Sequence, residues 1–221
     1  MKVCTDATLF GAMAPITGGE QTLDIGTGTG LLALMAAQLG ASHITGVELT
    51  TQAYEDARYN FYHSAWSERL HAVHGSIQDF CSNKPGVYDL IICNPPFFHN
   101  HSKATDRLRN QARHTDALSF SELLACVDQL QRDEGLCYLL VARPALAEVC
   151  RLAGEYGFYL IGQTDFRGYS HTSWKVSALT FSRQQKAYAY DSLTIYQSDR
   201  NYTKESTRFL APFLLRFGQS R

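Results

Sequence analysis

Short apolar runs alternate with longer amphipathic runs along the first third of the chain. Residues 21–25 (QTLDI) are mostly apolar, lie close to glycines on both sides and are too short for a helix, so they predict a buried strand. Residues 26–30 hold three glycines, and residues 31–39 are rich in Leu, Ala and Met, which favours a helix that ends before the next glycine. The same order repeats at residues 42–49 and 50–66, which indicates βαβ units.

The rest of the chain extends this order and then departs from it. Further strands are predicted over residues 70–76, 88–93, 136–142 and 158–166, and helices over residues 119–135 and from Pro144 to about Tyr156. Polar and apolar residues alternate over residues 173–182 and again over 191–197, which predicts antiparallel strands that close one edge of the sheet. We therefore expect residues 1–221 to form a single α/β domain around a mixed, mostly parallel sheet.

The composition disfavours several classes of protein. With 45% hydrophobic and 19% charged residues, the chain is typical of a globular protein and too apolar for a disordered one. It has no run of roughly 18 apolar residues and no signal peptide, so we expect it in the cytoplasm and not in a membrane. Its cysteines form no CxxC pair and lie near no histidine at metal-ligand spacing, so we expect reduced cysteines and no metal site.

The net charge of −1 hides an asymmetry along the chain. Residues 1–96 contain 4 Lys and Arg against 9 Asp and Glu, or −5, whereas residues 97–221 contain 16 against 12, or +4. A polyanion that contacts the second part would suit this distribution, and an uneven solvated surface would account for it equally well.

The glycines between the first predicted strand and helix stand where an open α/β sheet binds a nucleotide-like ligand. Asp24 precedes three glycines with the spacing G-x-G-x-G, whereas the dinucleotide motif G-x-G-x-x-G needs glycine where Leu31 stands, which disfavours a dehydrogenase. Glu48 ends the next strand 22 residues after Gly26, close to the offset of roughly 20 at which an acidic side chain binds ribose hydroxyls. The alternative is an ordinary strand-to-helix turn beside a surface glutamate.

The strand predicted over residues 88–93 is followed by Asn94, Pro95, Pro96 and Phe97. Proline cannot continue an internal ladder, so the strand must stop here. Asn94 followed by two prolines and an aromatic residue places one amide, one unpaired carbonyl and one ring in a stiff arrangement at the ligand edge of the sheet. The alternative is a strand terminator with a core phenylalanine.

Together these motifs resemble those of known methyltransferases. The D-x-G-x-G-x-G turn with the following VEL is similar to the S-adenosylmethionine site of class I methyltransferases, and NPPF is similar to the signature of amino-group methyltransferases. With the opening MKVCTDATLFGAMAP, RNQARHT at 109–115 and the final DRNYTKESTRFL, nearly the whole chain resembles the bacterial tRNA1(Val) adenine-N6 methyltransferase family. The resemblance implies a Rossmann-like class I methyltransferase fold, with a mostly parallel seven-stranded sheet and an antiparallel edge strand.

The resemblance also implies the reaction. Family members transfer a methyl group from S-adenosylmethionine to N6 of the adenosine beside the anticodon, position 37, of a valine tRNA. N5-glutamine protein methyltransferases and N2-guanine methyltransferases of ribosomal RNA share the Asn-Pro-Pro-aromatic motif and remain alternatives. A binding module that keeps the fold without the activity is disfavoured by the intact motif. We expect a monomer.

The residues that match the family's motifs define the implied site. The resemblance assigns catalysis to Asn94, Pro95, Pro96 and Phe97. It assigns cofactor binding to the chain start, the glycine turn and the strand ends, at Thr5, Asp6, Asp24, Gly26, Gly28, Glu48, Leu49, Ser76, Ile77 and Asn94. Ser76 stands where the family usually has the aspartate that binds the adenine amine, and Asp79 is close enough in sequence to replace it.

The segment after the Asn-Pro-Pro motif is the predicted RNA contact. Residues 97–114 hold four cations against the single acid Asp106, or +3, and these cations are Lys103, Arg107, Arg109 and Arg113. Beside the catalytic strand end they would meet phosphates of the anticodon arm. The alternatives are a solvated loop, or RNA bound near the C-terminus by Arg200, Lys204 and Arg208.

Overall fold

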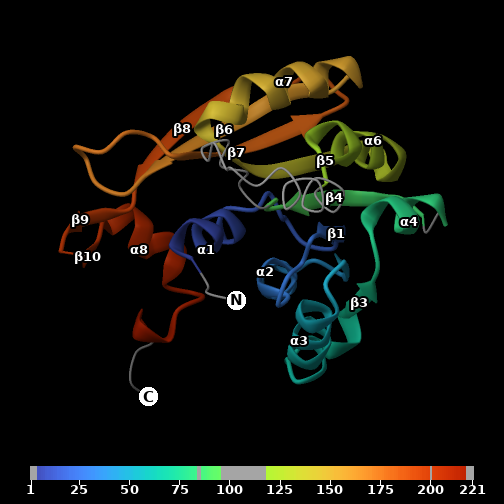
Figure 1. Ribbon diagram of the computed structural model, residues 1–221. Helices are drawn as coiled ribbons and strands as arrows, with labels where there is room; N and C mark the ends of the chain where they lie inside the picture. The colour runs from blue at the N-terminus through green and yellow to red at the C-terminus, as the bar shows by residue number, and fades with distance from the viewer. Residues whose placement is uncertain (1–3, 84–85, 96–117, 200, 218–221) are drawn as a thin grey trace, which may run out of the picture.

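The computed structural model describes residues 4–83, 86–95, 118–199 and 201–217 (Figure 1). Its main sheet contains β1 (Gln21–Ile25), β2 (His43–Glu48), β3 (Leu70–His74), β4 (Tyr88–Cys93), β5 (Gln131–Ala142), β6 (Tyr159–Arg167), β7 (Val176–Ser182) and β8 (Ala189–Thr194). A two-stranded sheet pairs β9 (Tyr196–Ser198) with β10 (Asn201–Tyr202). The helices are α1 (Thr5–Ala12), α2 (Leu31–Leu39), α3 (Thr51–Tyr62), α4 (Ile77–Ser82), α6 (Phe120–Leu130), α7 (Leu146–Glu155) and α8 (Lys204–Leu210), with 3-10 turns at Ser67–Arg69, Arg143–Ala145 and Leu215–Phe217.

The strands of the main sheet lie in the order β3-β2-β1-β4-β5-β7-β6-β8. Every neighbouring pair is parallel except the two that contain β7, which is antiparallel to both β5 and β6. The expected mixed, mostly parallel sheet is thus confirmed, with two corrections. Over the described ranges the sheet has eight strands rather than seven, and its antiparallel strand lies inside the sheet rather than at an edge.

The place of β7 follows from the connection before it. The chain turns back after β6 through residues 168–175, so β7 runs antiparallel to β6, and its largely buried residues pair with β5 on their other side. β7 therefore ends at the side of the sheet where β6 begins. The chain enters β8 at that side, with Ala189 opposite Gly162, so β8 runs parallel to β6. The antiparallel orientation expected for residues 191–197 is therefore wrong for residues 191–194, whereas Tyr196 and Gln197 belong to β9, which is antiparallel to β10.

Helix α6 is shorter than expected. The helix predicted over residues 119–135 begins as expected with the Ser119 cap, which forms a capping box with Glu122, but it ends at Leu130. The Gln131 side-chain amide donates to the Gly135 carbonyl at 2.8 Å, and Arg132 forms an ion pair with Asp89 of β4. Strand β5 therefore begins at once, because pairing with β4 prevails over the helical preference of the local sequence.

Residues of β4 show how the core is divided between the two faces of the sheet. Leu90 and Ile92 pack in a cluster with α1, α2, α3 and α8, whereas Ile91 and Cys93 pack in a second cluster with α4, α6 and α7. Figure 1 shows the sheet between α6 and α7 on one side and α1 and α2 on the other. Burial of both faces accounts for the continuous apolar run of β4 and for its central place. No helix in the described ranges is long and apolar enough to cross a membrane.

Gly30 is the residue that lets α2 begin against α3. Its φ is 86°, in the left-handed region, and a side-chain carbon there would lie 2.4 Å from the ring of Phe61. Phe61 is only 3% exposed, so its ring has little room to move away. Gly30 therefore meets a conformational and a steric requirement at the same position.

We expect Gly30→Ala to lower the free energy of unfolding by about 2–4 kcal/mol, through backbone strain and overpacking. Gly154→Ala in α7 is the matched control, because no atom would lie within 4 Å of its added carbon and its φ is not left-handed. That control should stabilise the protein by about 0.5–1 kcal/mol. Urea unfolding of both variants measures the difference, and equal midpoints would show that the turn yields to a side chain.

Candidate active site

Four adjacent strands end together at the carboxyl edge of the sheet. Gly26 follows β1, Glu48 ends β2, Gly75 follows β3 and Asn94 follows β4. The chain leaves β1 toward β2 and β3 and then crosses to β4 on the other side, so the strand order reverses between β1 and β4. Open α/β sheets bind ligands at such a reversal, which makes this edge the candidate site.

The glycine turn is fastened to the end of β2. The backbone N–H groups of Gly26 and Thr27 donate to the Val47 carbonyl at 2.9 and 3.0 Å, and that of Gly28 donates to the Glu48 carboxylate at 2.9 Å. Gly26 and Gly28 have φ values of 68° and 59°, which side chains rarely adopt. The turn therefore keeps one shape as long as β1 and β2 stay in register.

Glu48 is held rigidly although it lies at a ligand edge. Its second oxygen accepts the backbone N–H of Thr50 at 2.8 Å, and the side chain is largely buried. The Glu48 carbonyl accepts the N–H of Gly75, which ties the ends of β2 and β3 together. Each carboxylate oxygen keeps a further lone pair, so the group can still accept hydrogen bonds from a diol.

Asp24 lies beneath the turn, at 1% exposure. One of its oxygens accepts the Thr27 hydroxyl at 2.6 Å and the Ala33 backbone N–H at 3.1 Å, whereas the other has no hydrogen-bond partner within the described part of the chain. Burial, with a smaller contribution from the negative charge of Glu48, raises the pKa of Asp24 to about 7. Its contacts brace the turn and the first turn of α2, so Asp24 is placed to act on a ligand through the turn.

Ser76 and Asp79 form one unit at the start of α4. The Ser76 hydroxyl accepts the Asp79 backbone N–H at 3.0 Å and donates to the Asp79 carboxylate at 2.7 Å. Asp79 is exposed, so its carboxylate can accept a further hydrogen bond, while Ile77 beside it is buried. Leu49, at the end of β2, is 52% exposed and offers an apolar surface at the same edge.

Asn94 emerges beside the glycine turn. Cys93 and Ile25 are paired across β4 and β1, so Asn94 and Gly26 leave neighbouring strands at the same level, about 4.8 Å apart in the pairing direction. Asn94 is half-buried and Pro95 is buried, and β4 ends at Cys93 as expected. The predicted Pro96, Phe97, Lys103, Arg107, Arg109 and Arg113, together with Arg200, lie outside the described residues.

Thr5 and Asp6 begin α1 and lie against the last third of the chain. The hydroxyl groups of Thr5 and Tyr196 are 3.0 Å apart, and both Thr5 and Asp6 line a cavity of about 380 Å³ at the carboxyl ends of β6 and β8. Burial raises the pKa of Asp6, and the positive charge of Lys175 opposes this shift. Their assignment to the cofactor remains a prediction.

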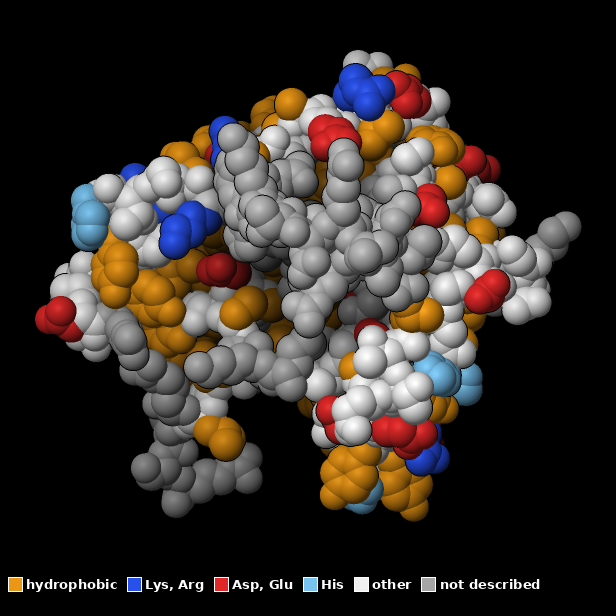
Figure 2. Space-filling model, in the orientation of Figure 1, with side chains coloured by type: hydrophobic (Ala, Val, Ile, Leu, Met, Phe, Trp, Pro, Cys, Tyr) orange, Lys and Arg blue, Asp and Glu red, His pale blue; other side chains and the backbone are white. Residues whose placement is uncertain are grey.

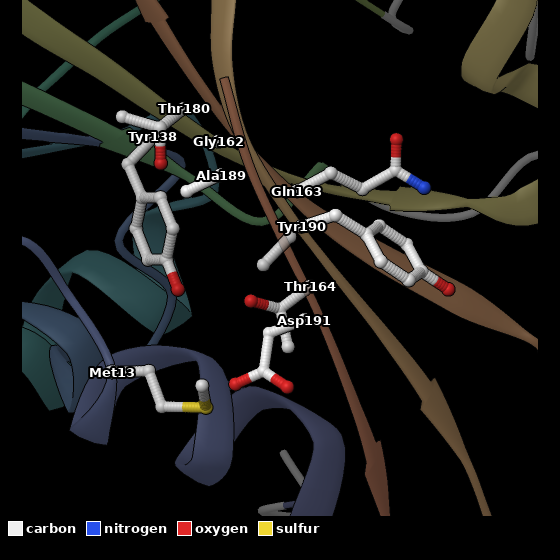
Figure 3. Close-up of a pocket in the computed structure, with 10 residues that line it drawn as sticks. Met13, Tyr138, Gly162, Gln163, Thr164, Thr180, Ala189, Tyr190 and Asp191 are labelled. Atoms are coloured by element: carbon white, nitrogen blue, oxygen red, sulfur yellow. The ribbon is translucent and has the colours of Figure 1, made fainter. Parts of the chain in front are cut away.

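A second cavity, of about 340 Å³, does not belong to this site (Figure 3). It lies between Met13 at the end of α1 and residues near the starts of β6 and β8, such as Gly162 and Asp191. The starts of these parallel strands are at the amino edge, opposite Asn94. No group of three or more possible metal ligands occurs among the described residues.

Sequence reasoning missed several residues that hold the site in shape. Thr27 braces Asp24, and Gly46 leaves room for Thr27, since a side-chain carbon at Gly46 would lie 2.9 Å from its side chain. Thr50 precedes α3 as its N-cap residue without a side-chain capping bond, and its backbone N–H fixes Glu48. A threonine three residues after an aspartate in a strand-to-helix turn was the one local signal that could have indicated the first of these contacts.

The chain resembles known proteins over nearly its whole length. The family described as Methyltransferase small domain matches residues 7–119. A tRNA1(Val) (adenine(37)-N6)-methyltransferase of Shewanella sp. (strain MR-4) is 36% identical over 219 residues, which cover 98% of this chain and 93% of that protein. One of Flavobacterium psychrophilum is 38% identical over 218 residues with the same coverage of both chains. The structure of a predicted O-methyltransferase from Agrobacterium tumefaciens matches with a TM-score of 0.72 at 15% identity, over 93% of this chain and 95% of that one, which confirms the class I methyltransferase fold.

We expect Asp24→Asn to change how stability depends on pH. The folded-state pKa of about 7 lies above the ordinary 3.8, so the stability that this carboxyl contributes is fully present below about pH 4 and is lost as the pH rises through 7. At about 1.4 kcal/mol per pKa unit, the wild type should lose up to about 4 kcal/mol relative to the variant between pH 4 and pH 8. Urea unfolding at a series of pH values measures this, and parallel profiles would show that Asp24 stays ionised.

Proposed function

Because the chain belongs to the tRNA1(Val) (adenine(37)-N6)-methyltransferase family, we propose that it transfers a methyl group from S-adenosylmethionine to N6 of adenosine 37 in a valine tRNA. The observation that carries this proposal is the pairing of Ile25 with Cys93, which sets Asn94 beside the glycine turn. A cofactor turn and an amine-holding side chain then share one strand edge. Bacterial tRNA is cytoplasmic, so we place the reaction there; a monomer remains a prediction.

The residues at the edge fit S-adenosylmethionine. Open space borders both Gly26 and Gly75, where an added side-chain carbon would meet no atom within 4 Å. Glu48 would accept hydrogen bonds from the ribose hydroxyls, and Asp79, oriented by Ser76, would accept one from the adenine amine. Leu49 and Ile77 would flank the adenine. Bound there, the cofactor supplies an electrophilic methyl group on a sulfonium.

Asn94 and Pro95 act on the substrate amine. The lone pair of an exocyclic amine is delocalised into the ring, which makes the nitrogen a poor nucleophile. Acceptance of its two N–H groups by the Asn94 side-chain oxygen and the Pro95 carbonyl turns the lone pair out of the ring plane and orients it for transfer. Phe97 is expected to stack on the base.

The experiment that tests this function uses the purified protein, S-adenosylmethionine and an unmodified valine tRNA transcript. We expect mass spectrometry of the digested RNA to show N6-methyladenosine, and a transcript with guanosine at position 37 to remain unmethylated. A release-factor peptide and ribosomal RNA, added in parallel, test the N5-glutamine and N2-guanine alternatives. Methylation of either one with none of the tRNA would replace the proposal.

We expect Asn94→Ala to lower the single-turnover rate with tRNA by roughly two to three decades, since one preorganised contact to the reacting amine contributes about 2.7–4 kcal/mol. Binding of S-adenosylmethionine, measured by calorimetry, should stay within a few-fold of wild type because the glycine turn and Glu48 are intact. Glu48→Ala is the matched control, and its main effect should be weaker binding of S-adenosylmethionine. Full turnover by the Asn94→Ala variant would show that Asn94 only terminates the strand.

A further inference from the structure

Aromatic rings from three segments stack in a row near the C-terminal end of the chain. Tyr169, in the loop between β6 and β7, lies 5.4 Å from Tyr196 of β9, and Tyr196 stacks on Tyr202 of β10 at 5.2 Å between ring centroids. His171 extends the row beyond Tyr169, with centroids 5.6 Å apart. The loop is joined to β9 by a hydrogen bond from the Tyr196 N–H to the Gly168 carbonyl, and Figure 1 shows the two segments close together. We call these four residues the aromatic row.

Cations flank the aromatic row. Between Asp165 and Asp191 the sequence holds four Lys and Arg and no acid, and two of these cations, Arg167 and Lys175, are at the row. The Arg167 guanidinium lies 4.3 Å from the ring centroid of Trp174 and donates to the Thr194 hydroxyl, and Lys175 is exposed. Neither forms an ion pair with the described residues. Figure 2 shows basic and histidine side chains bordering a hydrophobic area on the side of the molecule where this loop lies.

Tyr169 and Tyr196 of the aromatic row, together with Arg167 and Lys175, line the cavity of about 380 Å³ that is also lined by Thr5 and Asp6. This volume falls within the range of ligand pockets, roughly 300–1,000 Å³. Lys175 and Val176 lie at the start of β7, and β7 is two strands from β4, so the nearer side of the cavity lies roughly 10 Å along the same edge from Asn94. A polymer bound at Asn94 could therefore reach this cavity.

We propose that this cavity holds an unstacked base of the RNA next to the target adenosine, with Tyr169 and Tyr196 as the stacking surface and Arg167 and Lys175 on the adjoining phosphates. Aromatic rings beside cations are the features by which proteins bind single-stranded RNA, and here Tyr169 and Tyr196 are half-buried at the cavity, with Asp6 as the one acidic group among the described residues that line it. The proposal rests on the proposed function, because it assumes an RNA substrate, and it adds the surface that positions this substrate. The cofactor's methionine end, which the sequence assigns to Thr5 and Asp6, is the competing occupant.

The test compares Tyr169→Ala, Tyr169→Phe and Lys175→Ala with wild type, using a fluorescent anticodon stem-loop of valine tRNA between 50 and 200 mM salt. We expect Tyr169→Ala to weaken RNA binding roughly 5- to 150-fold, the range for loss of one stacked base, and Tyr169→Phe to restore it. Lys175→Ala should weaken binding and reduce the slope of log affinity against log salt by about 0.7. Lys175 is exposed, so this variant should fold normally.

Two matched controls remove the same groups at the opposite edge of the sheet. Tyr159→Ala, at the start of β6, removes a tyrosine that is 47% exposed, and Lys186→Ala removes an exposed cation between β7 and β8. Both should keep wild-type affinity and salt slope. In turnover assays the Tyr169→Ala and Lys175→Ala variants should raise KM for tRNA and leave kcat and the affinity for S-adenosylmethionine unchanged.

Two outcomes would overturn the proposal. Unchanged RNA affinity in both variants would show that the RNA is bound elsewhere, and a loss of S-adenosylmethionine affinity would assign the cavity to the cofactor. The binding measurements need no catalysis, so they decide the role of this surface even if the wild type methylates a base other than adenosine 37. Failure of the proposed function would instead appear as an absence of N6-methyladenosine with wild-type protein.

Discussion

The candidate site depends on the parallel register between β1 and its two neighbours. Val47 and Glu48 of β2 accept three consecutive N–H groups from residues 26–28, and Ile25 is paired with Val47 on one side and Cys93 on the other. A slip of one residue would turn the buried Leu23 and Ile25 to the opposite face of the sheet. The core that fixes the register therefore also fixes the distance between the glycine turn and Asn94.

The carboxylates of Asp24 and Glu48 lie close to one turn and repel each other, and a bound cation would reduce this repulsion. Asp24 is buried with one oxygen unpaired, and the negative charge of Glu48 adds to the effect of burial on its pKa. The Thr27 hydroxyl and the Ala33 N–H stabilise the charged form only in part. S-adenosylmethionine carries a sulfonium and an ammonium group against one carboxylate, so its net positive charge at the turn would favour the ionised form of Asp24. The acidic first part of the chain thus suits its proposed ligand.

The sequence predicted the parts of the fold whose signals are local. The strand at residues 88–93 and the helix at 31–39 were predicted with their observed bounds. A buried apolar run and a glycine stop can both be recognised in the sequence without knowing which segments pack against them. The early end of α6 and the place of β7 were not predictable, since both depend on pairing with β4 and β5 far away in the sequence. At the site, the spacing predicted an acidic residue at the end of β2, where Glu48 lies, whereas the burial of Asp24 beneath the turn depends on how α2 packs.

The antiparallel strand β7 brings part of the second half of the chain to the edge of the sheet that holds the candidate site. Because β7 reverses direction after β6, the loop between them, with Tyr169 and Trp174, lies at the carboxyl edge, the same edge as Asn94. A right-handed parallel crossover in its place would have carried the chain back to the amino edge before the next strand. The reversal therefore brings the cations of residues 167–175 to the edge at which the acidic first part forms the glycine turn. Along that edge, Asp24 and Glu48 lie at the proposed cofactor end, whereas Arg167 and Lys175 lie with Asp6 at the proposed RNA end.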